Sequence, residues 1–466
     1  MRRLIAVSLV VLLLSGCAVG PNYKRPSVDV PGAYRAASPQ EATPSAPESS
    51  LGDLKWWEVF QDKQLQDLIH AALQQNYDVR IAATRILQAQ AQVGITRADQ
   101  LPTINAGAQT NDQRSARAKL FPAFETSAHE VDLSLAWDLD FWGKYRRATE
   151  SARANLLATE WNREAVITTL VSDVAAAYFQ LRELDLELEI ARRTLASRQD
   201  SLRITQMLAN GGATSMLDVR QAEQLVFTAA ETIPDVERRI EQQENFISTL
   251  LGNNPSPIAR GMKLTEQPHA PEVPAGLPSR LLERRPDIRQ AEAQLIAANA
   301  QIGVAKADYF PQISLTANGG FQSSALTSLF TGPAGLWNFG GSLAQPIFAG
   351  GRIRSNVRSS EARQQEAALV YQQTIQQAFR GVSDALVEYR KDREFREQQE
   401  QLAFSAQDAA RLSETRYRGG ATSYLEVLTN ETNYFNAELG LAQAQLNELL
   451  GLVRIYRNLG GGWQEQ

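Results

Sequence analysis

The sequence predicts a mainly α-helical membrane protein in which β-strands contributed by several copies form a transmembrane β-barrel. Three observations support this fold class. The chain is an internal two-fold repeat, each half holds two segments of alternating apolar and polar side chains, and each half holds one very long helical stretch.

Charged side chains make up 21% of the 466 residues, and the formal net charge of −5 argues against nucleic acid as a partner.

The N-terminus has the pattern of an export signal. Two arginines precede the apolar run 4–14, and Leu14-Ser15-Gly16-Cys17 resembles the lipobox of bacterial lipoproteins. By that resemblance, residues 1–16 are removed and Cys17 carries N-acyl and S-diacylglycerol groups; the alternative is a plain signal peptide with a chance cysteine. Ala18 follows, rather than the aspartate that usually retains lipoproteins in the inner membrane, so we expect an outer-membrane location.

Cysteine and histidine usage limits the chemistry. Cys17 is the only cysteine, so neither a disulfide framework nor a cysteine metal cluster can be built, and the three histidines are scattered. The sequence lacks the GxxxxGK[ST], HExxH and GxSxG motifs. We therefore expect no enzyme activity, no metal and no cofactor beyond the lipid on Cys17.

The internal repeat divides the chain. Residues 78–104 and 287–313 match at an offset of 209, and Gly-Gly-Ala-Thr-Ser recurs at 211–215 and 419–423, an offset of 208. A proline-rich stretch separates the two halves and indicates an extended connector. We expect a signal peptide (1–16), a lipidated extended segment (17–52), a first repeat (53–252), the connector (253–277), a second repeat (278–457) and a tail (458–466).

Strands are expected after the first helix of each half, because Pro102 and Pro311 end those helices. Side chains alternate between apolar and polar in 313–322. The clearest alternation is in 131–141, where six apolar positions interleave with acidic and small ones, and 337–347 is its counterpart. A period of two over such lengths indicates strands with one apolar and one polar face.

Helices fill most of the rest. The segment of about 53–98 is rich in alanine, glutamine and leucine, and 144–210 contains neither glycine nor proline. A continuous helix of that second length would extend roughly 100 Å. In the second half, 353–418 has one glycine as an interruption. Each long helix should turn and return, over about 216–251 and 424–457.

The repeated glycine motif is interpreted as the turn of each helical hairpin. Glycine permits the left-handed residue that ends a helix, and Ser215 or Ser423 can cap the returning helix. The turn glycines are Gly211, Gly212, Gly419 and Gly420.

Four amphipathic strands per chain cannot close a membrane barrel, because the smallest such barrels have about eight strands. Several copies must therefore pool their strands. A dimer would supply eight strands and a trimer twelve; composition does not choose between them, although only the larger barrel leaves an open lumen.

Several motifs resemble the TolC-like outer-membrane efflux factors, in the lipoprotein branch typified by OprM and NodT. The resemblance covers essentially all of the mature chain. It implies a homotrimer with a 12-stranded β-barrel, four strands from each chain, continuous with a 12-helix periplasmic tunnel that docks an adaptor protein and an inner-membrane transporter, commonly of the resistance-nodulation-division type. The motifs are Lys55-Trp56-Trp57-Glu58-Val59-Phe60, Arg284-Arg285-Pro286-Asp287-Ile288, Ile347-Phe348-Ala349-Gly350-Gly351-Arg352 and Gly20-Pro21-Asn22-Tyr23.

The same resemblance implies a gate where the helices turn, in a passive duct whose transport energy comes from a partner. Acidic and tyrosine side chains near the turns hold the tunnel shut in that family. Asp218, Tyr417 and Glu426 match family positions, with Arg416 and Arg418 as candidate partners. A local interpretation competes, because Ser215-x-x-Asp218 and Ser423-x-x-Glu426 fit capping boxes.

Acidic side chains also mark the strands. Asp132, Asp138 and Asp140 share the polar face of one alternating run. We expect Asp132 and Asp138 to line the lumen and to favour cations, whereas Asp140 borders the helix and could equally be a solvated charge at the strand end.

Two other functions remain open on the sequence. One is the same duct serving type I protein secretion with an ATP-driven exporter. The other is a periplasmic coiled-coil adaptor lipoprotein without a pore, against which the four alternating segments argue. The sequence does not identify the substrate or the pump.

Overall fold

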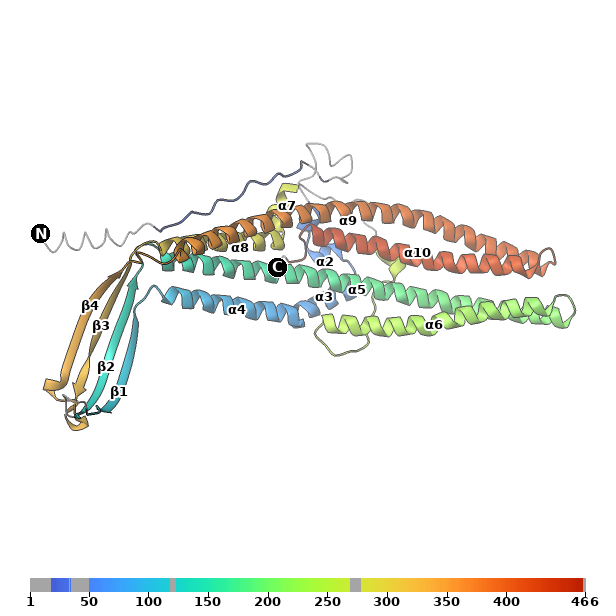
Figure 1. The fold of residues 1–466 in the computed structure, drawn as a ribbon. Helices are drawn as coiled ribbons and strands as arrows, with labels where there is room; N and C mark the ends of the chain where they lie inside the picture. The colour runs from blue at the N-terminus through green and yellow to red at the C-terminus, as the bar shows by residue number, and fades with distance from the viewer. Residues whose placement is uncertain (1–17, 33, 35–49, 118–122, 269–277, 464–466) are drawn as a thin grey trace. The chain divides into compact units, whose positions relative to one another are not determined.

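The computed structural model describes residues 18–32, 34, 50–117, 123–268 and 278–463; Cys17 and the expected signal peptide lie outside them. Two compact units each combine segments of both repeats (Figure 1). The strand unit comprises residues 1–28, 84–160 and 290–372, and the hairpin unit comprises 29–83, 161–289 and 373–466. The elements are η1 (Leu51–Asp53), α2 (Trp56–Val59), α3 (Lys63–Gln75), α4 (Tyr77–Ala98), β1 (Thr103–Arg114), β2 (Glu125–Leu139), α5 (Lys144–Asn210), α6 (Met216–Leu250), η2 (Leu264–Glu266), α7 (Pro278–Arg284), α8 (Pro286–Ala307), β3 (Gln312–Ser323), η3 (Leu326–Ser328), η4 (Gly332–Ala334), β4 (Gly335–Ala344), α9 (Arg352–Arg418) and α10 (Tyr424–Asn458).

The strand unit contains one antiparallel sheet in the order β1-β2-β3-β4 (Figure 1). Its register places Asp132 of β2 between Gly107 of β1 and Gly320 of β3. Gly320 is sterically required, because a Cβ there would lie 2.1 Å from the Val131 carbonyl oxygen, whereas a Cβ at Gly107 would lie 2.6 Å from the Asp132 carboxylate and would require that side chain to move. The sheet thus has room for a carboxylate at its centre.

Residues opposite one another in an antiparallel sheet share a face, so the register sorts the side chains. One face is mainly apolar across all four strands and becomes polar only at the end that holds Asp112, Arg114 and Glu125. Its members on the edge strands are exposed: Trp337 at 84%, Phe339 at 68% and Ile104 at 65%. The other face is mainly polar, although it also carries Ala136, Leu336 and Ala344. Its polar members include Asn105, Gln109, Glu130, Asp132, Ser134, Asp138, Ser314, Thr316, Asn318, Gln322, Asn338 and Ser342.

An extended strap, residues 18–25, packs on the strand unit. The Val19 amide donates to the Trp142 carbonyl at 3.0 Å, Arg147 donates to Asn22 at 2.8 Å, and Arg25 pairs with Glu292. At the closest approach Gly20 meets Gly303 of α8, where a Cβ on Gly20 would lie 2.5 Å from the Gly303 Cα. Small residues therefore permit the strap to contact the helix backbone.

The first expected helix is interrupted. The sequence predicts one helix over about 53–98, but α3 ends at Gln75 and α4 begins at Tyr77. Asn76 causes the break, because its side-chain oxygen accepts from the Asp78 amide at 2.8 Å and the Val79 amide at 3.2 Å. An asparagine competes with the helix backbone in this way, so the lack of glycine and proline did not ensure continuity.

The long helices agree with the expected ranges. Both α5 and α9 have 67 residues, and Gly381 does not interrupt α9. That glycine instead allows a close approach, since a Cβ there would lie 2.5 Å from the Asn458 side chain at the end of α10. Among the described helices, none combines the length and apolarity needed to cross a membrane.

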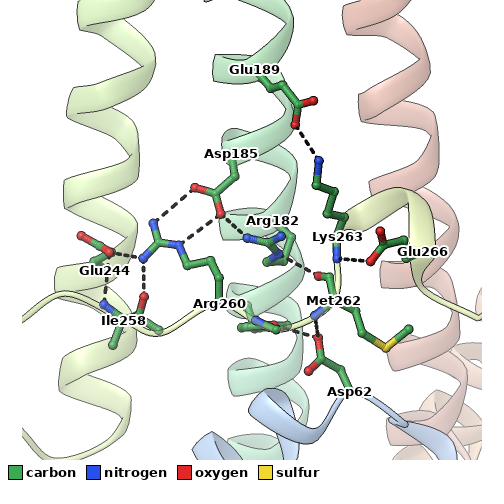
Figure 2. Close-up of polar contacts among 12 residues, drawn as sticks. Asp62, Arg182, Asp185, Glu189, Glu244, Ile258, Arg260, Met262, Lys263 and Glu266 are labelled. Carbon is green, nitrogen blue, oxygen red and sulfur yellow. Dashed lines mark hydrogen bonds and ion pairs between the residues drawn. The ribbon is translucent and has the colours of Figure 1, made fainter.

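A connector segment, residues 258–267, follows α6 and is fixed by buried polar contacts (Figure 2). Asp62, which is 1% exposed, is at their centre. Its carboxylate accepts hydrogen bonds from the Tyr178 hydroxyl at 2.8 Å, the Met262 amide at 2.9 Å and the Gln267 amide group at 3.0 Å. It also caps α3 through the Gln64 amide at 2.9 Å. One carboxylate thus joins α3, α5 and the connector.

A second group of contacts joins the connector to both helices of the first hairpin. Arg260 binds Asp185 of α5 through two nitrogens, at 3.1 and 3.3 Å, and also pairs with Glu244 of α6 (Figure 2). Arg182 donates to the Met262 carbonyl at 2.9 Å. The connector therefore binds α3, α5 and α6 together, in addition to linking the repeats. These contacts of Asp62, Arg182 and Arg260 are called the connector clamp below.

Candidate functional site

The two hairpin turns have the same backbone conformation. Gly212 and Gly420 have φ angles of 75° and 70°, the left-handed region that glycine adopts without strain. The Ala213 amide donates to the Leu208 carbonyl and the Ala421 amide to the Arg416 carbonyl, both at 2.9 Å, which closes each helix end.

The acids that follow the turns bind threonines. The Thr214 hydroxyl donates to Asp218, and the Thr422 hydroxyl donates to Glu426. The full capping boxes expected from the sequence are therefore wrong. Ser215 supplies half of one, accepting from the Asp218 amide at 3.4 Å, and Ser423 makes no side-chain cap bond. The physical reason is that the preceding threonine hydroxyl occupies the carboxylate that would otherwise bind the N-cap amide.

The two candidate arginines bind different acids. Arg416 lies 3.4 Å from the Glu426 carboxylate and joins α9 to α10 across the turn. Arg418 pairs instead with Glu414, one helical turn away on its own helix. Asp218 has no arginine partner among the described residues. Of the proposed pairs, the structure brings together only Arg416 and Glu426.

Tyr417 connects the hairpins. Its ring centroid lies 5.2 Å from that of Tyr424, and Tyr417 and Leu202 pack against a buried apolar cluster of Ala222, Tyr424 and Val427. The Tyr417 hydroxyl is buried and has no hydrogen-bond partner in the described structure. A buried hydroxyl without a partner costs free energy. This site at the tips therefore holds the two hairpins of one chain together at some energetic cost.

Sequence reasoning missed a buried arginine, Arg198, and an acid, Glu431, which border the same cavity further along the hairpins. Arg198 is 2% exposed, donates to the Leu225 carbonyl at 2.9 Å and stacks on the Phe435 ring. Burial lowers the pKa of Arg198 and raises the pKa of Glu431 to about 7. Both side chains keep a buried polar atom without a partner among the described residues. Because they are far apart in sequence, no local pattern could have indicated the pair.

The strand acids lie in different environments. Asp132 sits on the polar face of the sheet, where Glu130, hydrogen-bonded by Gln109 at 2.6 Å, adds a carboxylate that we had not predicted. Asp138 accepts from the Tyr145 hydroxyl at 2.9 Å; burial, followed by this bond, raises the pKa of Tyr145 to about 12.

Asp140 is a helix cap. Its carboxylate accepts from the backbone amides of Tyr145 at 3.1 Å and Arg146 at 2.9 Å, in the first turn of α5. Carboxylates are favourable at helix N-termini, so its position is structurally explained. Asp138 and Asp140 also border a cavity of about 620 Å³ at the end of the strands, beside the stacked rings of Trp142 and Phe310.

An amphipathic sheet and two long helical hairpins in one chain define a membrane channel component. The chain matches the outer membrane efflux protein family over residues 68–253 and again over 277–461, and it belongs to this family. It is an outer-membrane efflux channel.

Its relatives include pump components whose names refer to different substrates. The toluene efflux pump outer membrane protein TtgC of Pseudomonas putida is 35% identical over 470 residues, covering 100% of this chain and 96% of the relative. The cation efflux system protein CusC of Escherichia coli is 35% identical over 460 residues, covering 98% of each. The solved outer-membrane channel OprN is similar with a TM-score of 0.88 at 30% identity, covering 96% of this chain and 100% of that one.

Proposed function

We propose that three copies of this chain form a passive, gated exit duct. Their strands would make a 12-stranded barrel in the outer membrane, continuous with a 12-helix tunnel in the periplasm. Cys17, with its N-acyl and S-diacylglycerol groups, would anchor each copy to the membrane. The energy for transport would come from an inner-membrane transporter, reached through a periplasmic adaptor, and the chain itself would catalyse no reaction.

The observation that supports this proposal most directly is the open sheet. In the described structure β1 and β4 each pair with one neighbour, so each leaves an edge of unpaired backbone groups. Unpaired amides and carbonyls are costly in lipid, and pairing β4 of one copy with β1 of the next removes both edges. The apolar face would then meet lipid and the polar face would enclose water.

The polar face supports a preference for cations in the pore. Glu130, Asp132 and Asp138 lie on it, and the register places no lysine or arginine opposite them. Three copies would multiply these carboxylates around one lumen, which concentrates cations and repels anions. Measured anion selectivity in a reconstituted pore would refute this part.

We further propose that the cargo consists of small toxic compounds and that the transporter is of the resistance-nodulation-division type. The names of the relatives, which refer to toluene and to cations, support small cargo. A duct of this kind need not recognise what passes, so the partner pump would set the substrate range.

The test combines assembly with transport. Native mass spectrometry of the detergent-solubilised protein should give a trimer, and planar bilayers should show cation-selective conductance. Deletion of the gene should sensitise cells to dyes, solvents or antibiotics. A stable monomer without conductance would refute the duct, and loss of one secreted protein without sensitisation would favour the secretion alternative.

A further inference from the structure

A cavity of about 390 Å³ lies in the hairpin unit and is lined by residues of α5, α6 and α10. Its volume falls within the usual range of small-molecule sites, about 300–1,000 Å³. The cavity is separate from the hairpin tips and from the strand acids, and no role described above uses it. Leu184, Leu446 and Leu450 give it an apolar wall.

Glu183 is the notable member of the lining. The residue is only 5% exposed, yet no described residue donates a hydrogen bond to its carboxylate or forms an ion pair with it. Burial raises the pKa of Glu183 to about 7, with a smaller contribution from Glu187. The one cation in the lining, Arg239, is already bound to Glu187 at 2.9 Å. Neither Glu183 oxygen is both fully buried and unpaired, so the carboxylate opens onto the cavity, where it can accept a cationic donor.

The amides around Glu183 add acceptors. The Gln243 side-chain nitrogen donates to the Ala177 carbonyl at 2.8 Å and to Gln180 at 3.1 Å. The Gln443 nitrogen donates to Asn447 at 3.0 Å. The nitrogens of Gln243 and Gln443 are engaged, so their oxygens are left for a ligand, whereas the oxygens of Gln180 and Gln242 already accept from Gln243 and Arg238. The cavity therefore combines a carboxylate and amide oxygens with a leucine wall.

This combination suits a ligand with a cationic donor group and a hydrocarbon body. Within the described part of the chain, no three His, Cys, Asp or Glu side chains come together as a metal site requires. We propose that the cavity binds a small organic ammonium ion, its nitrogen on the Glu183 carboxylate and its hydrocarbon body on Leu184, Leu446 and Leu450. The proposal goes beyond the duct function, because a passive conduit needs no such site.

The charge of the site sets its pH dependence. The charged lining groups are Glu183 on α5 and Arg239 on α6, and α10 contributes none; Glu187, outside the lining on α5, also acts on Glu183. An ammonium ion binds the ionised carboxylate, so affinity should increase as the pH rises through the Glu183 pKa and decrease below it.

The experiment uses the full-length protein in detergent. Isothermal titration calorimetry at pH 8 with n-butylammonium chloride should show saturable binding, which Glu183→Gln should weaken about tenfold or more. Glu241→Gln, an exposed acid of α6 outside the lining, is the matched control and should leave the affinity unchanged. Gln443→Trp, at an exposed position of the lining, should obstruct the cavity while leaving Glu183 in place.

Several outcomes would overturn the proposal. The absence of n-butylammonium binding at pH 8 would do so, as would equal affinity in the Glu183→Gln protein once its unchanged size and unfolding temperature show that it folds. Equal binding of butan-1-ol would show that the cavity is merely apolar. Full displacement of n-butylammonium by millimolar K⁺ or Mg²⁺ would show that an inorganic cation is the ligand. None of these results depends on whether the protein conducts ions, so the duct function is tested separately.

Discussion

Replacing Asp62 with asparagine should loosen the connector clamp. The carboxylate accepts three hydrogen bonds in the clamp, from Tyr178, Met262 and Gln267, and also caps α3. The three clamp donors share Oδ2 and the Gln64 amide binds Oδ1, so an asparagine of the same size must turn its NH2 group either toward the clamp donors or toward the Gln64 amide, in a site that is 1% exposed. A buried donor left unpaired costs about 1–3 kcal/mol. With a second bond weakened, we expect the clamp to lose about 3 kcal/mol.

Hydrogen–deuterium exchange measures this loss locally. If the Met262 amide exchanges through local opening, about 3 kcal/mol corresponds to an exchange rate on the order of a hundredfold faster. Asp67→Asn is the matched control, because Asp67 is an exposed acid of α3 whose only described ion pair is with Lys63 at 3.6 Å. Unchanged exchange at Met262 in the Asp62→Asn protein, or equal acceleration in the control, would refute the role given to Asp62.

Three further changes test other parts of the chain. Gly303→Ala should displace the strap, because the new Cβ would lie 2.7 Å from the Val19 carbonyl oxygen. Gly94→Ala is the control, since Gly94 is the equivalent position of the first repeat and has open space around it. Limited proteolysis should cleave residues 18–28 faster in the Gly303→Ala protein only. Tyr417→Phe should stabilise the tips by about 1 kcal/mol, measured by chemical unfolding, and destabilisation would contradict the unpaired hydroxyl. In the folded chain the pKa of Glu431 is raised to about 7, so its carboxyl keeps a proton that the unfolded chain releases above about pH 4.5. The free energy of unfolding should therefore decrease as the pH rises from about 4.5 to about 7. Glu431→Gln should remove this decrease, as measured by thermal unfolding at several pH values.

The regular elements were predictable because their signals are local. Each strand is indicated by the alternation of apolar and polar side chains within one short segment, and each long helix by an uninterrupted stretch without proline. The helix expected over 144–210 is α5, with the same bounds. The break at Asn76 was missed because the competing side-chain bond depends on one residue and leaves the periodicity intact. Arg198 and Glu431, and the Asp62 contacts, join residues far apart in sequence, so only the fold could bring them together.

The candidate gate was predictable in position but not in its bonds. The repeated glycines place the turns, and the acids after them follow from the motif. Which arginine pairs with which acid depends on side-chain direction at a helix end: Arg416 points across the turn, whereas Arg418 binds Glu414 on the same helix. The threonines that displaced the capping boxes were part of the repeated motif and were visible in the sequence.

The two tips share a backbone conformation but differ in charge, and this difference is testable. At the offset of 208, Leu208 of the first hairpin stands where Arg416 stands in the second, so the ion pair to Glu426 has no counterpart at Asp218. In the proposed trimer, tips with this ion pair and tips without it would alternate around the tunnel. Glu426→Ala should therefore raise the open probability in single-channel recordings more than Asp218→Ala, because it also releases Arg416. The pair is largely exposed, so the effect should be modest and should shrink at high salt. Equal effects of the two substitutions would show that the arginine pair does not distinguish the tips.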